Sequence, residues 1–323
     1  MRKRQTVKQM PRQKGVALIT AMLVVAIAAL VAADVAWEQN LQMRRSAAML
    51  AHEQGKLYGL GAEAIAIDIL LEDRDDPNEV DHLSETWADE WAPVEVDEGS
   101  IQGSVEDMQG RFNINNIYRN GQVDQIAMEQ FRRLLRILEL DEAVADSVLD
   151  WIDPDQEVCC AAGAEDDTYT SLTPPYRAAN RYLTSTSELQ AVANMTPEIF
   201  RTLQPYISAL PPGWCGSNEI THINVNTASE QVLLAISADV TQGNVDQWVA
   251  EREDQDGYRD LNAFSEVVAE DVLAGRYIGL NSECFAARSL ITVGSFRVSM
   301  YSLLDRQGQA DSIVTRLRYF GVY

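Results

Sequence analysis

The chain has 323 residues, with 49 acidic against 26 basic side chains and a formal net charge of −23 at pH 7. So negative a surface repels phosphate groups, which excludes nucleic acid as a partner. About 290 residues follow Asp34, enough for a large hydrophobic core and for two domains. The sequence contains no nucleotide-binding, hydrolase or metalloprotease motif, so an enzyme is not expected.

The N-terminus changes abruptly from basic to apolar. Residues 1–14 carry six basic side chains and no acidic one, Gly15 follows, and Val16–Ala33 is an apolar run of eighteen residues. As a helix this run would span about 27 Å, the thickness of a bilayer core. The preceding positive charge predicts one membrane crossing with a cytoplasmic N-terminus. Two interpretations stay open: an ordinary anchor, or a prepilin leader cleaved after Gly15 to leave Val16 as the mature N-terminus.

Thr20 would be the fifth residue of the mature chain after such cleavage. In the pilin and pseudopilin superfamily, which the leader junction resembles, this position is normally glutamate, paired in the filament with the N-terminal amine of a neighbouring subunit. A buried carboxylate without a partner is costly, so a subunit with nothing above it tolerates threonine better. Thr20 is therefore a candidate tip-specific position, although threonine is also common in membrane helices.

Helical periodicity continues beyond the apolar run. Apolar residues recur at spacings of three, four or seven from Ala47 to Leu71, and no proline follows until Pro77, so one helix is expected over residues 16–73. Segments typical of β-strands follow early and late in the chain, at 93–96, 101–105, 289–293, 296–304 and 312–320. These patterns predict an α+β fold with strands near both ends and helices between.

The helical middle contains a weak internal repeat. One unit opens with Phe112–Asn116 and the other with Ile223–Ser229, and each continues into two helices, an acidic loop and a Ser-Glu helix start. Asn226 and Thr227 are N-cap residue types for the helix that follows them. The units cover about 112–205 and 222–275, inside an expected α-domain of 112–285. Neither has the Gly-hydrophobic-Gly hairpin of helix-hairpin-helix DNA-binding domains.

The densest acidic run lies in the first unit. Asp153 and Asp155 flank Pro154, and Glu165, Asp166 and Asp167 return after a turn-rich loop. Carboxylates on such a loop are ligands that calcium prefers, and at close range they would repel one another without a cation. The run therefore predicts a calcium site, with a solvated acidic loop as the alternative.

Four cysteines lie in the part of the chain that the predicted topology places outside the cytoplasm, where disulfides persist. Their spacing matches no zinc or CxxC motif. Cys215 and Cys284 are the preferred pair. The adjacent Cys159 and Cys160 either pair with each other or stay free.

Taken together, these features resemble the K-type minor pseudopilin family of type II secretion systems, over essentially the whole chain. The resemblance rests on the Gly15 junction, the missing glutamate at Thr20, the length, and the helical domain set between strands. It also rests on two segments, Gly163–Asn180 and Ile223–Ala228. It implies a pilin-like fold in which a long N-terminal helix (16–73, of which 16–33 crosses the membrane) packs on an antiparallel sheet formed by residues 74–111 and 286–323.

The same resemblance implies a function. A prepilin peptidase would remove residues 1–15 and N-methylate Val16. The protein would sit in the inner membrane with its bulk in the periplasm, and would cap the tip of a pseudopilus with the I- and J-type minor pseudopilins. Further implied partners are the major pseudopilin, the inner-membrane assembly platform, secreted substrates and the outer-membrane secretin. The family's α-domain binds calcium, which favours the Asp153–Asp167 region. The alternative is an unprocessed, membrane-anchored periplasmic receptor.

Overall fold

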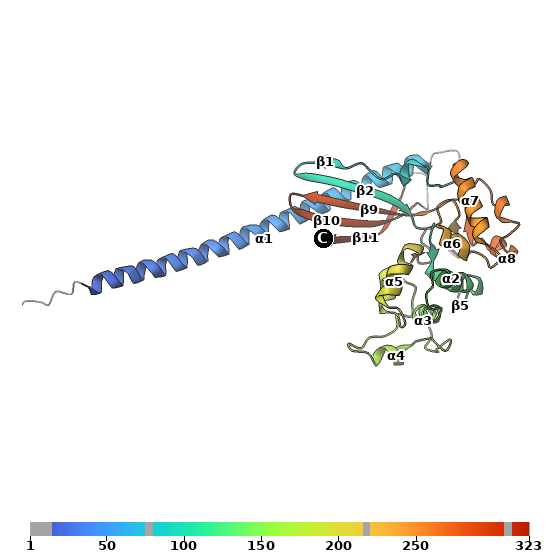
Figure 1. The fold of residues 1–323 in the computed structure, drawn as a ribbon, viewed down its shortest axis with the longest axis horizontal. Helices are drawn as coiled ribbons and strands as arrows, with labels where there is room; N and C mark the ends of the chain where they lie inside the picture. Colours follow the sequence, from blue (N-terminus) through green and yellow to red (C-terminus); the bar gives the residue numbers. More distant parts are fainter. Residues whose placement is uncertain (1–14, 75–79, 216–219, 307–311, 323) are drawn as a thin grey trace, which may run out of the picture. The chain divides into compact units, whose positions relative to one another are not determined.

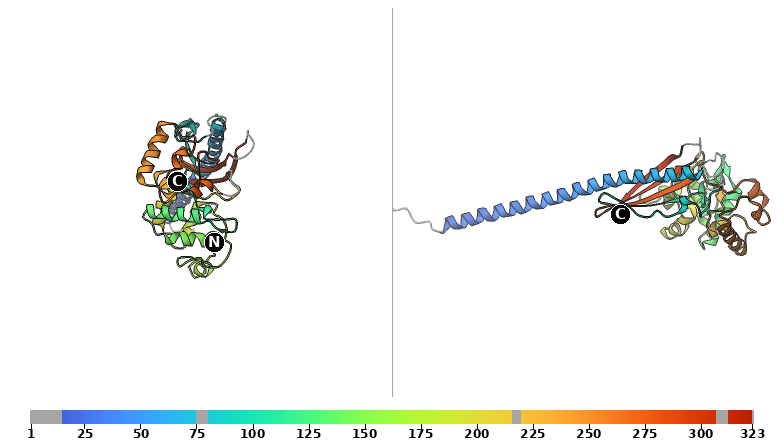
Figure 2. Two further views of the ribbon diagram at one scale, coloured as in Figure 1. Left: turned by 90° about the vertical axis from the view of Figure 1, so that its right-hand side faces the viewer. Right: turned by 90° about the horizontal axis from the view of Figure 1, so that it is seen from above.

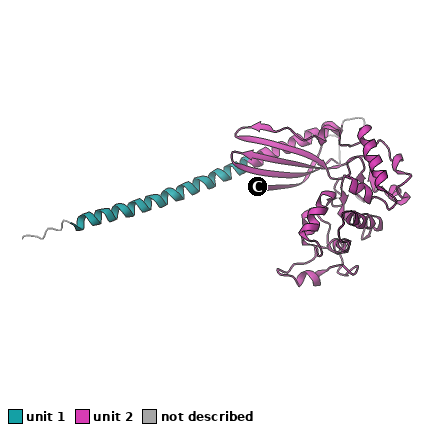
Figure 3. Ribbon diagram, viewed as in Figure 1, with its two compact units in different colours: residues 1–54 teal, residues 55–323 magenta. Residues whose placement is uncertain are grey.

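The structure of the protein is a computed structural model that describes residues 15–74, 80–215, 220–306 and 312–322. The chain divides into two compact units, residues 1–54 and residues 55–323 (Figure 3). One helix, α1 (Val16–Arg74), starts in the first unit and ends in the second (Figure 1). It ends one residue beyond the end expected from the apolar periodicity.

The described part of the first unit consists of the N-terminal portion of α1. This portion is long and apolar enough to cross a membrane, and none of its apolar window of 18 residues is buried within the part of the chain that the structure describes. Thr20 Oγ lies 3.1 Å from the carbonyl oxygens of both Val16 and Ala17. The hydroxyl is therefore satisfied by its own helix, which makes threonine tolerable in an apolar surrounding.

The second unit is built on a five-stranded antiparallel sheet. In sheet order its strands are β1 (Val94–Val96), β2 (Gly99–Asp107), β9 (Cys284–Val293), β10 (Phe296–Asp305) and β11 (Val314–Val322). The expected strands from both ends of the chain thus join in one sheet. β9 begins five residues earlier than expected, because pairing with β2 and β10 outweighs the low strand propensity of Ala286 and Ala287.

The C-terminal part of α1 covers one face of this sheet, as the views of Figure 2 show. A Cβ at Gly55 would lie 2.7 Å from Val298 and one at Gly59 would lie 2.7 Å from Met300, so the two glycines permit a close approach. Buried Glu63 of α1 bonds to the sheet, where Arg318 Nη2 donates to it at 2.6 Å. Burial alone would raise the pKa of Glu63, but its hydrogen bonds outweigh this effect and lower it.

A helical part lies between β2 and β9 and is made of two smaller pieces, here called the first and second helical units. A short 3-10 helix, η1 (Thr86–Ala88), precedes β1. The first helical unit contains β3 (Phe112–Asn113), η2 (Ile114–Ile117), β4 (Tyr118–Arg119), β5 (Gln122–Val123), α2 (Gln125–Ile137), α3 (Ala143–Ile152), α4 (Asp166–Thr170), η3 (Thr186–Ala191), α5 (Pro197–Leu203), η4 (Gln204–Tyr206) and β6 (Ile207–Ser208). The second helical unit contains β7 (Ile223–Asn224), α6 (Glu230–Ala235), α7 (Gln242–Asp254), η5 (Asn262–Phe264), α8 (Glu270–Ala274) and β8 (Ile278–Gly279).

The two helical units are closed in the same way. In each, the opening strand pairs in parallel with the strand that ends the unit, β3 with β6 and β7 with β8. In each, the opening strand ends in an asparagine, Asn113 or Asn224. A second buried asparagine, two residues later, makes two hydrogen bonds to the backbone of a residue far along the chain. Asn115 binds the N–H and C=O of Leu183, and Asn226 binds those of Tyr258. This shared geometry supports the internal repeat inferred from the sequence.

The N-cap of α6 differs from the expected one. Ser229 caps this helix, and its hydroxyl accepts a hydrogen bond from the N–H of Val232. Asn226 is instead committed to Tyr258, and the hydroxyl of Thr227 bonds to the buried Asp107. All three residue types suit an N-cap, so local sequence alone could not separate them.

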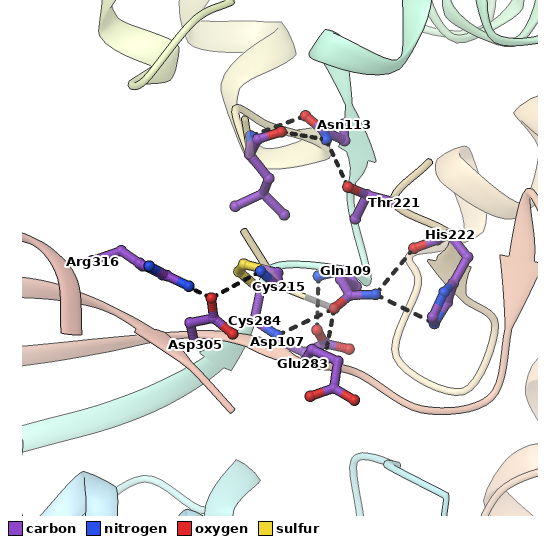
Figure 4. The surroundings of a disulfide bond; sticks show 11 residues. Asp107, Gln109, Asn113, Cys215, Thr221, His222, Glu283, Cys284, Asp305 and Arg316 are labelled. Atoms are coloured by element: carbon purple, nitrogen blue, oxygen red, sulfur yellow. Dashed lines mark hydrogen bonds and ion pairs between the residues drawn. A yellow bond between two sulfur atoms is a disulfide. The ribbon is translucent and has the colours of Figure 1, made fainter. Parts of the chain in front are cut away.

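Buried polar contacts fasten the helical part to the sheet (Figure 4). Gln109 Oε1 accepts hydrogen bonds from the backbone N–H groups of Glu283 at 2.6 Å and Cys284 at 3.1 Å. Cys284 forms a disulfide with Cys215, the pair preferred from the sequence. The N–H of Cys215 donates to Asp305 of β10 at 3.0 Å. The chain is thereby tied to the sheet where it leaves β2 and where it enters β9.

Candidate functional site

Three acidic side chains meet in the first helical unit, at the end of α3. Helix α3 ends at Ile152 because Pro154 disfavours a helical conformation at Asp153. The loop that follows returns to Glu165, directly before α4. Asp153, Asp155 and Glu165 each place a carboxylate oxygen within 4.8 Å of the other two. Oxygens spaced in this way can share one cation at the 2.3–2.6 Å typical of calcium.

The protein supplies few hydrogen-bond donors to these oxygens. Asp153 is 5% exposed and Glu165 is 4% exposed. Within the described residues, Asp153 Oδ1 and both carboxylate oxygens of Glu165 are buried without a hydrogen-bond partner. Burial, with repulsion from neighbouring carboxylates, raises the pKa of Asp153 to about 6 and that of Glu165 to about 7. Buried anions without donors are costly unless a cation pairs with them, so the donor set fits calcium.

A second group of three acidic side chains differs from the first in having an arginine beside it. Asp73, Asp81 and Glu85 also place carboxylate oxygens within 4.8 Å of one another. There the protein provides the positive charge itself, because Arg306 pairs with Asp73 at 2.7 Å and with Asp81. No ion pair of this kind is found for Asp153, Asp155 or Glu165 among the described residues, which makes the first cluster the better cation site.

The structure gives the other two predicted ligands different surroundings. Asp166 Oδ1 accepts a hydrogen bond from the N–H of Ala178 at 3.0 Å, and its other oxygen lies 3.6 Å from Arg177. Asp167 is exposed on α4. The group of three mutually close acidic oxygens includes neither residue.

Two side chains near the cluster did not figure among the predicted ligands. Asp150 is fully buried and its Oδ2 has no hydrogen-bond partner among the described residues, while its Oδ1 accepts from the N–H of Cys159 at 3.2 Å. Asn180 donates to the carbonyl of Asp155 at 2.6 Å, and its own buried Oδ1 has no partner within the residues that the structure describes. Asp150 begins the acidic run and could have been included on that ground. Asn180 has no local signal, since its position depends on the path of the loop.

The other cysteines lie beside this cluster. Cys159 is exposed, Cys160 is half-buried, and both are free thiols. Of the two states left open by the sequence, the structure has the unpaired one.

The candidate processing site lies at the start of α1. Val16 is the first residue of the helix, and Gly15 precedes it in an exposed turn. A Cβ at Gly15 would meet no atom of the described residues within 4 Å, so packing against them does not require glycine at this position. The expected leader, residues 1–15, lies outside the described residues except for Gly15.

These features define a class of protein. A long helix with an apolar N-terminal half, whose C-terminal half packs on an antiparallel sheet, is the architecture of pilin-like proteins. Here a two-unit helical part is inserted into the sheet between β2 and β9.

Comparisons with known proteins identify the family. Models described as type II secretion system protein K match residues 110–212 and 223–277, which coincide closely with the two helical units. The chain is 34% identical to a type II secretion system protein K of Pseudomonas aeruginosa, covering 91% of this chain and 89% of that protein. It is 32% identical to one of Klebsiella pneumoniae, covering 97% and 98%.

A solved structure agrees with this relationship. The crystal structure of the GspK-GspI-GspJ complex from the enterotoxigenic Escherichia coli type 2 secretion system contains a chain with a TM-score of 0.68 and 25% identity. The match covers 86% of this chain and 99% of that one. The chain therefore belongs to the type II secretion system protein K family, and it is a minor pseudopilin. The pilin-like fold expected from the resemblance is confirmed.

Proposed function

We propose that the protein caps the tip of a periplasmic pseudopilus and helps to start or limit its growth. The observation that carries this proposal is the helical part inserted between β2 and β9. A subunit with so large an addition to its head is difficult to cover with a further layer of subunits. Thr20 supports the same role, because a terminal subunit has no neighbour whose amine a carboxylate at this position could neutralise.

The partners of this tip would be the I- and J-type minor pseudopilins. The support is that the similar E. coli chain was solved in a complex with GspI and GspJ. The test is purification of the full chain from membranes that also contain both candidate partners. Co-elution of the three proteins is expected. Elution of this chain alone, with its leader intact, would favour a membrane-anchored periplasmic receptor instead.

The proposed topology follows from the charge and the apolar helix. The N-terminus lies in the cytoplasm, α1 crosses the inner membrane, and residues from about Asp34 onward lie in the periplasm. Prepilin peptidase cleaves after Gly15 and N-methylates Val16. The major pseudopilin, the assembly platform, secreted substrates and the secretin complete the set of proposed partners. The role is structural, and no catalytic step is assigned.

We further propose that the first helical unit binds calcium through Asp153, Asp155 and Glu165. Calcium would supply positive charge to buried carboxylates and fix the loop between α3 and α4. Three carboxylate oxygens of Asp153 and Glu165 are buried without a hydrogen-bond partner among the described residues, and the pKa values of both groups are raised, which supports this site. Titration of the chelator-treated full chain with calcium in a calorimeter tests it. Saturable heat is expected for the wild-type chain, and an unchanged titration in Asp153→Asn would contradict the assignment.

A further inference from the structure

A hollow with a volume of about 950 Å³ lies where the sheet meets the first helical unit. Residues of β2, β9, β10 and β11 line it, together with α5 and the residues around the start of η3. Small-ligand sites occur preferentially where two parts of a protein meet, and this volume is at the upper end of their range. The hollow does not include the calcium ligands, and the capping role leaves it without a ligand.

The charged side chains of the hollow balance one another. Arg111, Arg288 and Glu90 line it. Both arginines also pair with Glu106, Arg111 at 2.7 Å and Arg288 at 3.1 Å. Two arginines against two glutamates leave no formal net charge, although the whole chain carries −23. Charges that are balanced in this way give an ionic ligand no net attraction, so the hollow favours a neutral ligand.

Neutral hydrogen-bonding side chains are concentrated on the helical part of the lining. Residues 184–187, around the start of η3, have the sequence Thr-Ser-Thr-Ser, and all four line the hollow. Gln190 and Gln204 line it as well; both are exposed, and neither side-chain amide bonds to another described residue. Hydroxyl and amide groups both donate and accept hydrogen bonds. They therefore match a ligand whose own groups both donate and accept, as the hydroxyls of a sugar do.

Aromatic rings lie on the sheet part of the lining. Tyr301 of β10 and Tyr319 of β11 are cross-strand partners, and both line the hollow. Their ring centroids are 6.4 Å apart, and Tyr319 is 47% exposed. An exposed tyrosine presents a large apolar ring face together with a polar hydroxyl. A pyranose ring is complementary to it, because the C–H groups of the sugar form an apolar face and its hydroxyls project from the edge.

We propose that this hollow binds a short, neutral oligosaccharide, with a sugar ring against Tyr301 and Tyr319 and sugar hydroxyls bound by Gln190, Gln204 and the hydroxyl side chains of residues 184–187. The neutrality of the ligand follows from the balanced charges, its many hydroxyls from the amide and hydroxyl groups, and its flat apolar faces from the tyrosine rings. A β-1,4-linked hexose chain meets all three requirements, because its hydroxyls are equatorial and leave both ring faces apolar. The site does not depend on the capping role or on calcium.

The test measures sugar binding by the full chain in nanodiscs. The probe is cellohexaose with an uncharged fluorescent label at its reducing end, and fluorescence anisotropy should show saturable binding that unlabelled cellohexaose reverses. The cationic glucosamine hexamer should compete at least tenfold less well. General electrostatic attraction predicts the reverse order, because the protein carries a charge of −23.

A neutral hexapeptide, Ser-Val-Thr-Val-Ser-Val, tests a peptide as the alternative occupant, and it should not displace the sugar. The proposal would be overturned if cellohexaose failed to saturate the protein up to millimolar concentration. It would also be overturned if the glucosamine hexamer or the peptide competed better than cellohexaose itself.

Variants place the binding in the hollow. Tyr319→Ala should weaken binding of cellohexaose roughly tenfold, because it removes an aromatic face, whereas Tyr319→Phe should keep most of the affinity. Gln204→Glu preserves the shape of the side chain but adds a charge, and it should weaken binding as well. Phe296→Ala is the matched control, because Phe296 is an exposed ring of β10 outside the lining of the hollow, and the affinity of this variant should stay within twofold. Melting temperatures close to that of the wild type confirm that the variants fold. Equal losses in Phe296→Ala and Tyr319→Ala would overturn the proposal.

Discussion

Replacing Glu165 with glutamine should affect stability in opposite ways with and without calcium. In wild-type protein without calcium, Glu165 has a pKa of about 7 and two buried oxygens with no hydrogen-bond partner in the described part of the chain. A shift from the ordinary 4.5 to about 7 corresponds to roughly 3 kcal/mol of unfavourable free energy when the group must ionise. Glu165→Gln removes the charge, so in EGTA at pH 7.5 the variant should be the more stable protein.

Added calcium should first remove this difference in stability between Glu165→Gln and the wild type, and then make the wild type the more stable protein. A ligand present at a hundred times its dissociation constant stabilises the folded state by about 2.7 kcal/mol. The wild type gains this stabilisation and Glu165→Gln, which lacks one of the three anionic ligands, gains far less. With a shift of about 2–4 °C per kcal/mol, each effect amounts to about 5 °C or more in melting temperature.

The pH dependence has a defined sign. Because the pKa values of Asp153 and Glu165 are raised in the folded state, the stabilisation they give is full below about pH 4 and is lost as the pH rises through about 6 to 7. In EGTA the wild type should therefore lose stability over this range, and Glu165→Gln should lose less. Added calcium should offset the loss in the wild type.

The assay is differential scanning fluorimetry of the full chain in nanodiscs, in EGTA and across a calcium series. Glu157→Gln is the control, because Glu157 is an exposed carboxylate of the same loop and its replacement changes the net charge equally. This control should follow the wild type under all conditions. Equal calcium shifts in the wild type and in Glu165→Gln would refute the assignment of Glu165 to the metal site.

Three further predictions concern the membrane junction, the disulfide and the helix–sheet contact. Gly15→Asp should block removal of the leader. Mass spectrometry should therefore find the intact leader in the variant and a chain beginning at methylated Val16 in the wild type. Wild-type protein that retains the leader would contradict this prediction. The double variant Cys215→Ser/Cys284→Ser should lose roughly 4 kcal/mol, because the disulfide closes a loop with a sequence separation of 69 residues, and denaturant titration that finds less than 1 kcal/mol would argue against it. Glu63→Gln should cost about 2 kcal/mol at pH 7, because it removes the charge that accepts hydrogen bonds from Arg318. The pKa of Glu63 is lowered in the folded state, so the difference in stability from wild type should begin to shrink below the ordinary pKa of glutamate and should be lost as the pH falls through the lowered folded-state pKa. A constant difference from pH 7 to pH 3 would show that its charge does not contribute.

Much of the fold was predictable from the sequence because the patterns are local. The apolar and amphipathic periodicity predicted α1 to within one residue of its end. The β-rich segments at both ends predicted the strands, although the start of β9 depends on its two neighbours. The parallel pairings β3–β6 and β7–β8 were not predictable, since two-residue strands carry no periodic signal.

The candidate metal site was predicted as a region and less well as a set of residues. Asp153, Asp155 and Glu165 do come together, because a loop connects the end of α3 to the start of α4. Asp166 was an equally reasonable ligand by sequence, but its side chain bonds to the backbone of Ala178. Which acidic residues of a run point toward one another depends on loop geometry that neighbouring charges do not reveal.

This minor pseudopilin should lie at the tip of the pseudopilus. The most direct measurement is electron microscopy of assembled pseudopili in which the helical part carries a gold-binding tag at the exposed turn Asn120–Gly121. One label is expected at one end of each pseudopilus, and none along its length. Labels distributed along the filament, or filaments with no label at either end, would contradict it.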